Sequence, residues 1–179
     1  LDTAGARLPL SKLDLIRRSG ENLLRLVNRI LDLAKLESNT LKMENIQADV
    51  VPYLHYVAES LHSLANAKNI LLRVESEVAT LVMDYDPERL LQIVYNLLSN
   101  AVKFTPSGGR VTMRLQVEKS GSGEQALLIA VTDTGVGIPP ADLPFVFNRF
   151  FQAGNRASAG ESGSGIGLSL TAELVKAMG

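Results

Sequence analysis

The sequence predicts an α+β protein: a two-layer α/β sandwich, with a mixed sheet and helices on one face, preceded by one long helix. Two observations predict this class. Between residues 11 and 37, apolar residues recur at alternating intervals of three and four with no proline, which is typical of a single helix. After residue 41, short strand-like segments are interleaved with segments of helical spacing. We therefore predict two domains, 1–39 and 40–179.

The long helix is predicted by an apolar seam that Gly20 interrupts once. The seam consists of Leu13, Ile16, Leu23, Val27, Ile30 and Ala34. Leu24 and Leu31 widen this stripe, which suits a helix in a bundle better than a two-stranded coiled coil. A helix of about 26 residues spans roughly 39 Å. We therefore expect it to project and pair with another chain, so that the protein forms a homodimer.

The second part of the chain alternates between the two periods. Strands are predicted at 41–47, 70–75, 80–83, 110–117 and 126–131, and helices from Pro52, from Asp86 to about Val102, and at 166–178. Pro52 and Pro87 each suit the first turn of a helix, and Asp86 is a suitable N-cap. This order predicts helices over one face of a sheet.

Composition excludes several classes of function. Eighteen basic residues against 19 acidic ones create no field that would attract nucleic acid. The chain has no cysteine and two histidines, which leaves little room for a zinc site. No apolar run approaches the ~18 residues of a membrane-spanning helix. We expect a soluble segment that contacts neither nucleic acid nor a membrane directly.

Two asparagines define the first candidate motif, in the segment 96–103. Asn96 and Asn100 are four residues apart on a predicted helix, so their side chains share a face, and Lys103 follows about one turn later. Two amides and an ammonium on one face suit a phosphate-bound Mg²⁺, which prefers oxygen ligands. Taken alone, such a segment is more often a polar helix face in solvent.

The second motif, 133–138, stands where an apolar strand ends. Asp133 can accept a hydrogen bond from an exocyclic amine such as that of adenine, and Gly135 and Gly137 allow the backbone to approach a base closely. The alternative is an ordinary turn after a strand. Because Asp-x-Gly is common in such turns, the segment by itself favours the ordinary turn.

A glycine-rich third motif, 163–168, precedes the last helix. Its free N–H groups can face an anion, as helix N-termini do for phosphates. Leu168 replaces the third glycine of a dinucleotide-binding fingerprint, and the P-loop Gly-Lys-Ser/Thr does not occur. A flexible linker is the alternative.

Together, in this order, the three motifs resemble the N, G1 and G2 boxes of the ATP-binding domain of sensor histidine kinases in two-component systems. These kinases belong to the wider family of gyrase, Hsp90 and MutL ATPases, so the resemblance implies a Bergerat-type fold with ATP and Mg²⁺ as cofactors. It makes Asn100 the main Mg²⁺ ligand, with Asn96 beside it. Lys103 would contact phosphate, and Phe104 would pack near the nucleotide. Asp133 would bind adenine N6, and Gly135, Gly137 and Ile138 would line the base pocket. The lid hinge and the phosphate-facing turn would consist of Gly163, Ser164, Gly165, Gly167 and Leu168. The segment 145–151 resembles the F box of the lid, and Gln152 stands where many relatives have arginine.

The resemblance also implies the reaction. Hydrolytic relatives usually place a glutamate base where this chain has Asn96, and asparagine cannot act as a base. We therefore expect donation of the γ-phosphoryl group to a histidine. Neither His55 nor His62 has the expected context, so that histidine is expected on a helix preceding Leu1, with residues 11–38 as the second helix of the dimerisation hairpin.

Further expectations follow from the same resemblance. A receiver domain of a response regulator is the implied partner, the location is cytoplasmic, and strands are expected after Gly179. Two other interpretations stay open: a non-catalytic dimerisation and signalling module whose nucleotide site has decayed, and a hydrolytic ATPase of the gyrase and Hsp90 type.

Overall fold

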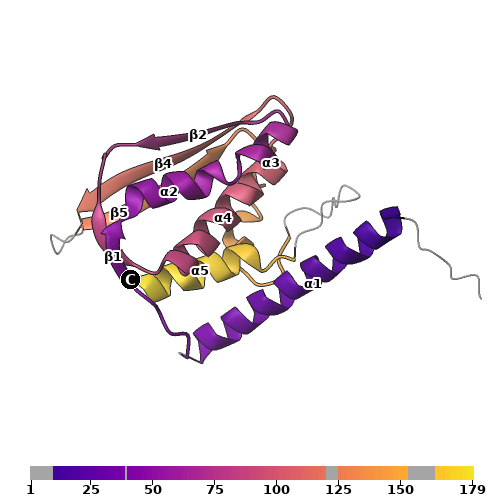
Figure 1. The fold of residues 1–179 in the computed structure, drawn as a ribbon, viewed down its shortest axis with the longest axis horizontal. Helices are drawn as coiled ribbons and strands as arrows, with labels where there is room; N and C mark the ends of the chain where they lie inside the picture. Colours follow the sequence, from indigo (N-terminus) through magenta and orange to yellow (C-terminus); the bar gives the residue numbers. More distant parts are fainter. Residues whose placement is uncertain (1–9, 39, 120–124, 153–163) are drawn as a thin grey trace, which may run out of the picture. The chain divides into compact units, whose positions relative to one another are not determined.

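A computed structural model of the chain describes residues 10–38, 40–119, 125–152 and 164–179. The structure divides into two compact units, Leu1–Leu41 and Lys42–Gly179. Among the described residues, the first unit consists mainly of α1 (Leu10–Glu37), and the second holds every strand and the remaining helices (Figure 1). No helix in the described ranges is long and apolar enough to cross a membrane.

The predicted long helix is present as α1, 28 residues in length. Arg17 pairs with Glu21 one turn later, at 2.8 Å between Nη1 and Oε1, but both side chains are more than half exposed, so the pair contributes little stability. Several large apolar side chains of the helix are also more than half exposed: Leu15, Ile16, Leu23, Leu24 and Leu31. The helix therefore carries an apolar stripe that its own unit does not cover.

Two sheets form the second unit. β2 (Leu71–Ser76), β4 (Arg110–Lys119) and β5 (Gln125–Asp133) make a mixed sheet, in which β2 runs parallel to β4 and β5 runs antiparallel to it. A separate antiparallel pair joins β1 (Ile46–Asp49) to β3 (Val82–Tyr85). The predicted strand at 41–47 is thus displaced toward the helix that follows it.

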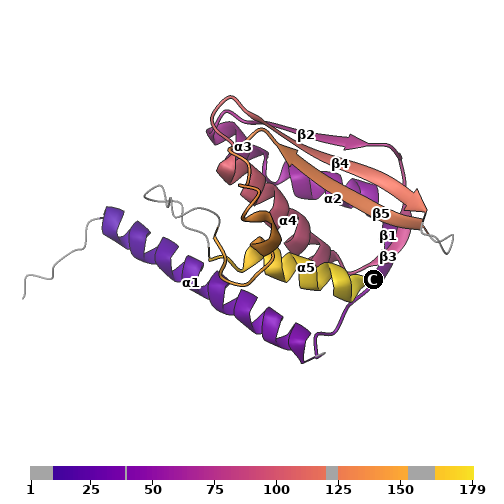
Figure 2. The same ribbon diagram turned by 180° about the vertical axis from the view of Figure 1, so that it is seen from behind.

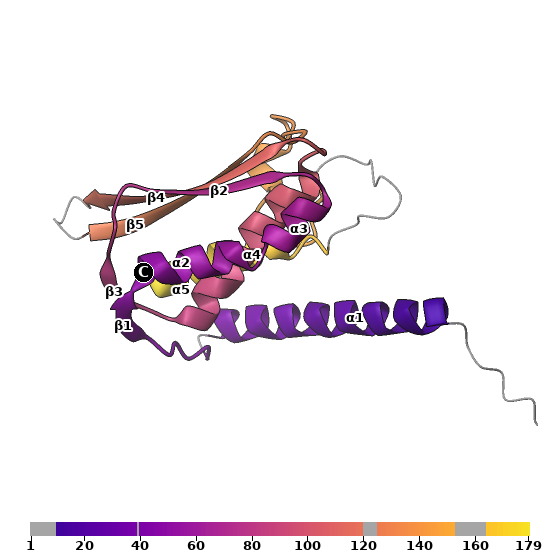
Figure 3. The same ribbon diagram turned by 45° about the horizontal axis from the view of Figure 1, so that its top comes forward.

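The helical layer lies against one face of the mixed sheet. It includes α2 (Val50–Glu59), α3 (His62–Ala67), α4 (Pro87–Phe104) and α5 (Gly167–Met178). Figure 3 shows the strands β2, β4 and β5 as one layer with α2, α4 and α5 beneath them. A short 3₁₀ turn, η1 (Leu143–Phe145), lies in the segment between β5 and α5. The predicted two-layer α+β fold is confirmed.

Apolar side chains from α2, α4 and the inner face of the sheet make the core. In β4, Val111, Met113 and Leu115 are fully buried, and the intervening Arg114 is exposed, as the alternation predicts. The helices α2 and α4, with Leu61 just before α3, contribute other large, fully buried side chains of this core: Val50, Leu54, Val57, Val94, Leu98 and Val102. The core therefore anchors α4, which carries the first predicted motif.

The helix predicted to begin at Pro52 begins two residues earlier. Asp49 caps it, because Asp49 Oδ1 accepts a hydrogen bond from the Val51 amide at 3.1 Å and a second from the Leu81 amide at 2.9 Å. The helix also stops at Glu59, so His62 lies on α3 instead of on the same helix as His55.

Side chains from elsewhere in the fold hold the start of α4. Asp86 is the predicted N-cap, and its Oδ1 accepts hydrogen bonds from the Glu88 and Arg89 amides at 2.9 and 3.1 Å. The Tyr53 hydroxyl donates to the Pro87 carbonyl at 2.6 Å. Burial, and to a smaller extent the neighbouring Tyr85, raise the pKa of the Tyr53 phenol above its usual 10.0, which is the direction that favours the protonated form that donates this bond.

Candidate functional site

The three predicted motifs lie on three elements that meet in the second unit. Asn96, Asn100 and Lys103 are on the second half of α4, Asp133 ends β5, and Gly167 begins α5. Figure 2 shows the segment after β5, in orange, running beside α4 toward the start of α5. The fold therefore gathers segments that are distant in the sequence, since Asn96 contacts Thr171, 75 positions later.

Asn96 lies at the contact between α4 and α5. Its side chain is buried, with 8% of its surface exposed, and its Nδ2 donates to the Thr171 hydroxyl at 3.0 Å. A Cβ atom added at Gly167 would lie 2.3 Å from Asn96 Oδ1. Gly167 therefore lets the first turn of α5 approach this amide more closely than any other residue could.

Asn100 lies one turn further along α4 and is half-buried. Its amide makes no hydrogen bond with another residue that the structure describes, unlike the amide of Asn96. The chemistry of the site fits Mg²⁺, because Asn100 offers a hard oxygen ligand without first giving up a protein partner. Asn96 fits a metal ion less well, since its oxygen lies against the start of α5.

Lys103 and Phe104 form the end of the same helix. The Lys103 ammonium lies 4.8 Å from the centroid of the Phe104 ring, which is half exposed. This is a cation–π contact at a solvent-accessible position, where such contacts are worth about 0.5–1 kcal/mol. The contact is weak enough for a stronger anionic partner to displace the ammonium.

The turn after β5 packs against the end of α4. Asp133 Oδ1 accepts a hydrogen bond from the Gly135 amide at 2.8 Å, and the carboxylate itself is exposed. A Cβ atom at Gly135 would lie 2.6 Å from both Asp133 Oδ1 and the carbonyl oxygen of Phe104. A glycine at 135 thus brings the Asp133 carboxylate next to the last residues of α4.

Gly137 and Ile138 lie in the more open part of this turn. Gly137 has a φ of 69°, a left-handed conformation that glycine adopts without strain. Ile138 is 43% exposed and its neighbour Val136 is 83% exposed. These apolar side chains line an accessible surface beside Asp133.

The third motif makes a tight turn against the segment before it. Gly165 has a φ of 67°, and a Cβ atom there would lie 2.6 Å from the carbonyl carbon of Phe150. The Phe150 amide donates to the Gly165 carbonyl at 2.8 Å, and the Ile166 amide donates to Ser164 Oγ at 3.4 Å. Leu168 is half-buried on α5. Gly163 lies outside the described residues.

Phenylalanines predicted as an F box lie between β5 and this turn. Phe145 and Phe151 are in contact, with ring centroids 5.9 Å apart. Phe147 and Phe150 are 57% and 66% exposed. The segment thus presents apolar rings to solvent near the motif residues of α5.

Sequence reasoning missed several residues that shape the site. Thr171 is the partner of the Asn96 amide, and its position one turn after Gly167 on α5 was the available signal. Thr134 joins the Asp133 turn to β4, since its Oγ1 accepts a hydrogen bond from the Arg110 amide at 2.9 Å. Lys68 donates to two carbonyls at the end of α4, and no motif in the sequence pointed to it.

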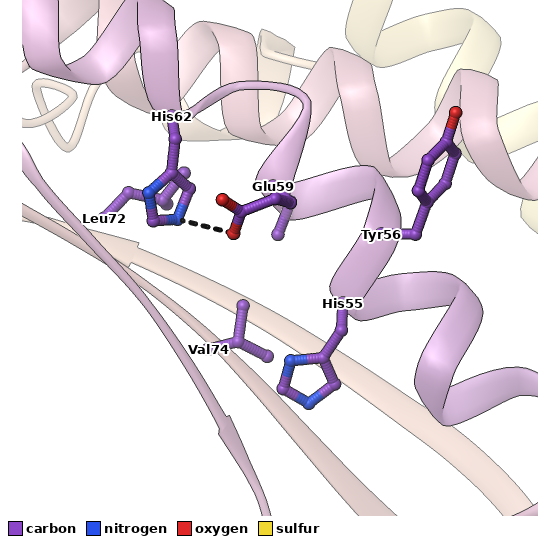
Figure 4. Close-up of a pocket in the computed structure, with 7 residues that line it drawn as sticks. His55, Tyr56, Glu59, His62, Leu72 and Val74 are labelled. Atoms are coloured by element: carbon purple, nitrogen blue, oxygen red, sulfur yellow. Dashed lines mark ion pairs between the residues drawn. The ribbon is translucent and has the colours of Figure 1, made fainter.

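A surface cavity of about 430 Å³ lies elsewhere, between α2, α3 and β2. Figure 4 shows His55, Glu59, His62, Leu72 and Val74 around it, with His62 Nε2 3.6 Å from Glu59 Oε2. None of the motif residues lines this cavity.

Across the part of the chain that the structure describes, no three His, Asp or Glu side chains form a group that could hold a metal ion. A metal ion held by the predicted motif would therefore depend on the amide oxygens of Asn96 and Asn100.

Comparison with known proteins agrees with this arrangement. Residues 85–179 match the family model of histidine kinase-, DNA gyrase B- and HSP90-like ATPases. The chain is 36% identical over 165 residues to the sensor protein GacS of Pseudomonas syringae pv. syringae, and 31% identical over 179 residues to histidine kinase P4 of Formosa agariphila. These matches cover 92% and 98% of the chain, but only 18% and 13% of the two relatives.

Solved structures extend the similarity to three dimensions. Full-length ShkA, in a crystal structure with AMPPNP, superposes with a TM-score of 0.79 at 29% identity, covering 96% of this chain and 35% of that chain. The Acinetobacter baumannii histidine kinase AdeS has a TM-score of 0.75 at 17% identity, which is a likeness of fold, and the match covers 97% of this chain and 77% of AdeS. With motifs, fold and relatives in agreement, the chain belongs to the family of histidine kinase-, DNA gyrase B- and HSP90-like ATPases, on the histidine kinase side of that family.

Proposed function

We propose that this chain binds Mg-ATP at the junction of α4, the Asp133 turn and the start of α5, and donates the γ-phosphoryl group to a histidine. The observation that carries the proposal is that the second and third motifs both meet the first motif on α4. Gly167 lies close against the Asn96 side chain, and Gly135 lies close against the Phe104 carbonyl. The AMPPNP bound to ShkA, a structural relative over 96% of this chain, supports the same choice of ligand.

Each proposed role follows from the chemistry of the group. The exposed Asp133 carboxylate accepts a hydrogen bond from the adenine amine, and Gly135, Gly137 and Ile138 line the base. Asn100 is the residue that would hold Mg²⁺, with Asn96 behind it. The ion, when bound, neutralises charge on the phosphates during transfer. Lys103 pairs with phosphate. The turn before α5 and the first residues of that helix face the phosphate chain: Gly163, Ser164, Gly165, Gly167 and Leu168.

Transfer is favoured over hydrolysis by the character of Asn96. Its amide donates to Thr171 and has no basic atom with which to activate water. A phosphoryl transfer needs mainly positioning and charge neutralisation from this domain, since the acceptor supplies the nucleophile. The acceptor is a histidine outside these 179 residues, because His55 and His62 lie beside a cavity that no motif residue lines.

We also propose the division of labour between the units. Residues 1–39 are part of a dimerisation and histidine-phosphotransfer helix, and residues 40–179 are the catalytic ATP-binding domain. The exposed apolar stripe of α1 supports pairing with a second copy in a helix bundle. The receiver domain of a response regulator is the proposed downstream partner, a choice supported by relatives that are named a sensor protein and a sensor kinase/phosphatase.

A calorimetric titration of this chain with AMPPNP, with and without Mg²⁺, tests the proposal. We expect metal-dependent binding that weakens tenfold or more, about 1.4 kcal/mol, in both Asp133→Asn and Asn100→Asp. Asp84→Asn is a matched control, because Asp84 is an exposed carboxylate on β3 that belongs to none of the motifs. Unchanged affinity in both site variants would refute the assignment. No binding by the parent chain would favour the non-catalytic signalling module, and phosphate release without a histidine-bearing partner would favour the hydrolytic ATPase.

A further inference from the structure

The carboxyl end of α4 requires hydrogen-bond partners from outside the helix. The last four carbonyls of any α-helix have no partner within it. In α4 these carbonyls belong to residues 101–104. The Ala101 carbonyl accepts from the Thr105 amide at 3.0 Å and from the Thr105 hydroxyl at 2.6 Å, so the C-cap residue satisfies it. The next two carbonyls are left for a different group.

Lys68 satisfies both of them. Its ammonium donates to the Val102 carbonyl at 3.1 Å and to the Lys103 carbonyl at 2.7 Å. Lys68 directly follows α3 and is half-buried. A cation at the carboxyl end of a helix is also favoured by the helix dipole, and hydrogen bonds from a charged donor are stronger than neutral ones.

The backbone around Lys68 holds it in this position. Asn69 has a left-handed backbone, with a φ of 54°, and its carbonyl accepts a hydrogen bond from the Gly108 amide at 3.0 Å. The Leu71 amide donates to the Gly109 carbonyl at 3.0 Å. The turn after α3 is therefore fastened to the turn after α4, and Lys68 has little freedom to leave the helix end.

We propose that Lys68 is a positioning residue for phosphate recognition, an inference that rests on the Mg-ATP site proposed above. The turn of α4 that Lys68 closes is the turn that carries Lys103 and Phe104. With its ammonium committed to two carbonyls, Lys68 holds this turn helical. Lys103, whose own ammonium lies over the Phe104 ring, then stays one turn after Asn100 on the same helix. Without Lys68, the last turn of α4 frays, and the Lys103 side chain is no longer held in a fixed orientation.

This role predicts a selective effect on ligands. Recognition of the base depends on Asp133 and the turn after β5. This turn touches the Phe104 carbonyl, but the hydrogen bond between Thr134 and the Arg110 amide also ties it to β4, and that bond does not involve Lys68. Recognition of the phosphates depends on Lys103. Loss of Lys68 should therefore weaken binding of a triphosphate and spare binding of adenosine, whereas a general loosening of the domain would weaken both.

The test is titration calorimetry of this chain with Mg-AMPPNP and, separately, with adenosine. We expect Lys68→Met to weaken Mg-AMPPNP about tenfold and adenosine by less than about twofold, since only the phosphate contact is affected. Lys68→Arg, which keeps a charged donor, should restore Mg-AMPPNP affinity to within about threefold of the parent. Lys42→Met, at an exposed lysine of the same unit, is the charge-matched control and should change neither ligand.

A double variant separates action through Lys103 from a direct contact. If Lys68 acts through Lys103, the combination of Lys68→Met and Lys103→Met binds Mg-AMPPNP no more weakly than Lys103→Met alone. Losses that add, equal losses for both ligands, or unchanged affinity in Lys68→Met would each overturn the inference while leaving the Mg-ATP site in place. A parent chain that binds neither ligand would overturn the site and this inference together.

Discussion

The proposed nucleotide site has two halves that the fold holds in different ways. The helical half consists of Asn96 to Phe104 on α4 and Gly167 to Thr171 on α5, and the loop half consists of Asp133 to Ile138. In the helical half, Asn96 and Thr171 are 8% and 6% exposed and are bonded to each other. In the loop half, Val136 is 83% exposed and Ile138 is 43% exposed.

This difference indicates where the free energy of each half resides. Buried polar pairs in the helical half are costly to break, because a buried group that loses its partner keeps its desolvation penalty. Groups in the loop half can exchange protein partners for water, so substitutions there should cost less stability. Substitutions at Gly167, Thr171 and Gly137 should therefore differ in their cost to the free energy of unfolding.

The largest effect is expected for Gly167→Ala. The added Cβ would lie 2.3 Å from Asn96 Oδ1, within a buried contact between two helices. We expect a loss of about 2–3 kcal/mol in the free energy of unfolding, measured by urea denaturation. The double variant with Asn96→Ala removes the atom that clashes, so its loss should be smaller than the sum of the two single losses. Strict additivity would contradict the close contact.

An intermediate effect is expected for Thr171→Val. The substitution keeps the shape of the side chain but leaves Asn96 Nδ2 buried without its acceptor. The expected loss is about 1–2 kcal/mol in the free energy of unfolding. Thr171→Ser retains the hydroxyl and serves as the control. If valine proves as stable as serine at this position, the amide of Asn96 is not held by this bond.

The smallest effect is expected for Gly137→Ala in the loop half. Space is available, since no atom lies within 4 Å of the added Cβ, so the cost comes only from the left-handed backbone at a φ of 69°. We expect a loss of about 1 kcal/mol. Gly137→Asn should cost less, because asparagine tolerates this conformation better than alanine. A loss as large as that of Gly167→Ala would remove the distinction between the halves.

Much of the fold was predictable because its signals are local. The apolar periodicity of α1, the Asp86 cap with Pro87, and the alternation in β4 each depend on residues close together in the sequence, and each is confirmed. The start of α2 was predicted wrongly at Pro52. Asp49 caps that helix while its carboxylate also binds the Leu81 amide, a contact 32 residues away that no local pattern contains.

The site was predictable in part for the same reason. Asn96, Asn100, Asp133 and the glycines were recognisable because their spacing within each motif is short. Their functional roles stay predictions until the titrations are made. Thr171 and Lys68 were not recognisable, since each acts on a residue at least 34 positions away, and a single threonine or lysine is common on any helix or turn.

By itself, the sequence determined the class of the fold, the order of its elements and the identity of the three motifs, because helical and strand periodicity and glycine turns are properties of neighbouring residues. Only the tertiary structure decided which of the two asparagines keeps an open amide. Asn96 and Asn100 are equivalent in type and lie on the same helix, yet Thr171 and Gly167 on α5 enclose the first and leave the second accessible. That choice depends on packing between α4 and α5, whose bonded residues Asn96 and Thr171 are 75 positions apart, and close approach and burial there decide which polar group is bonded.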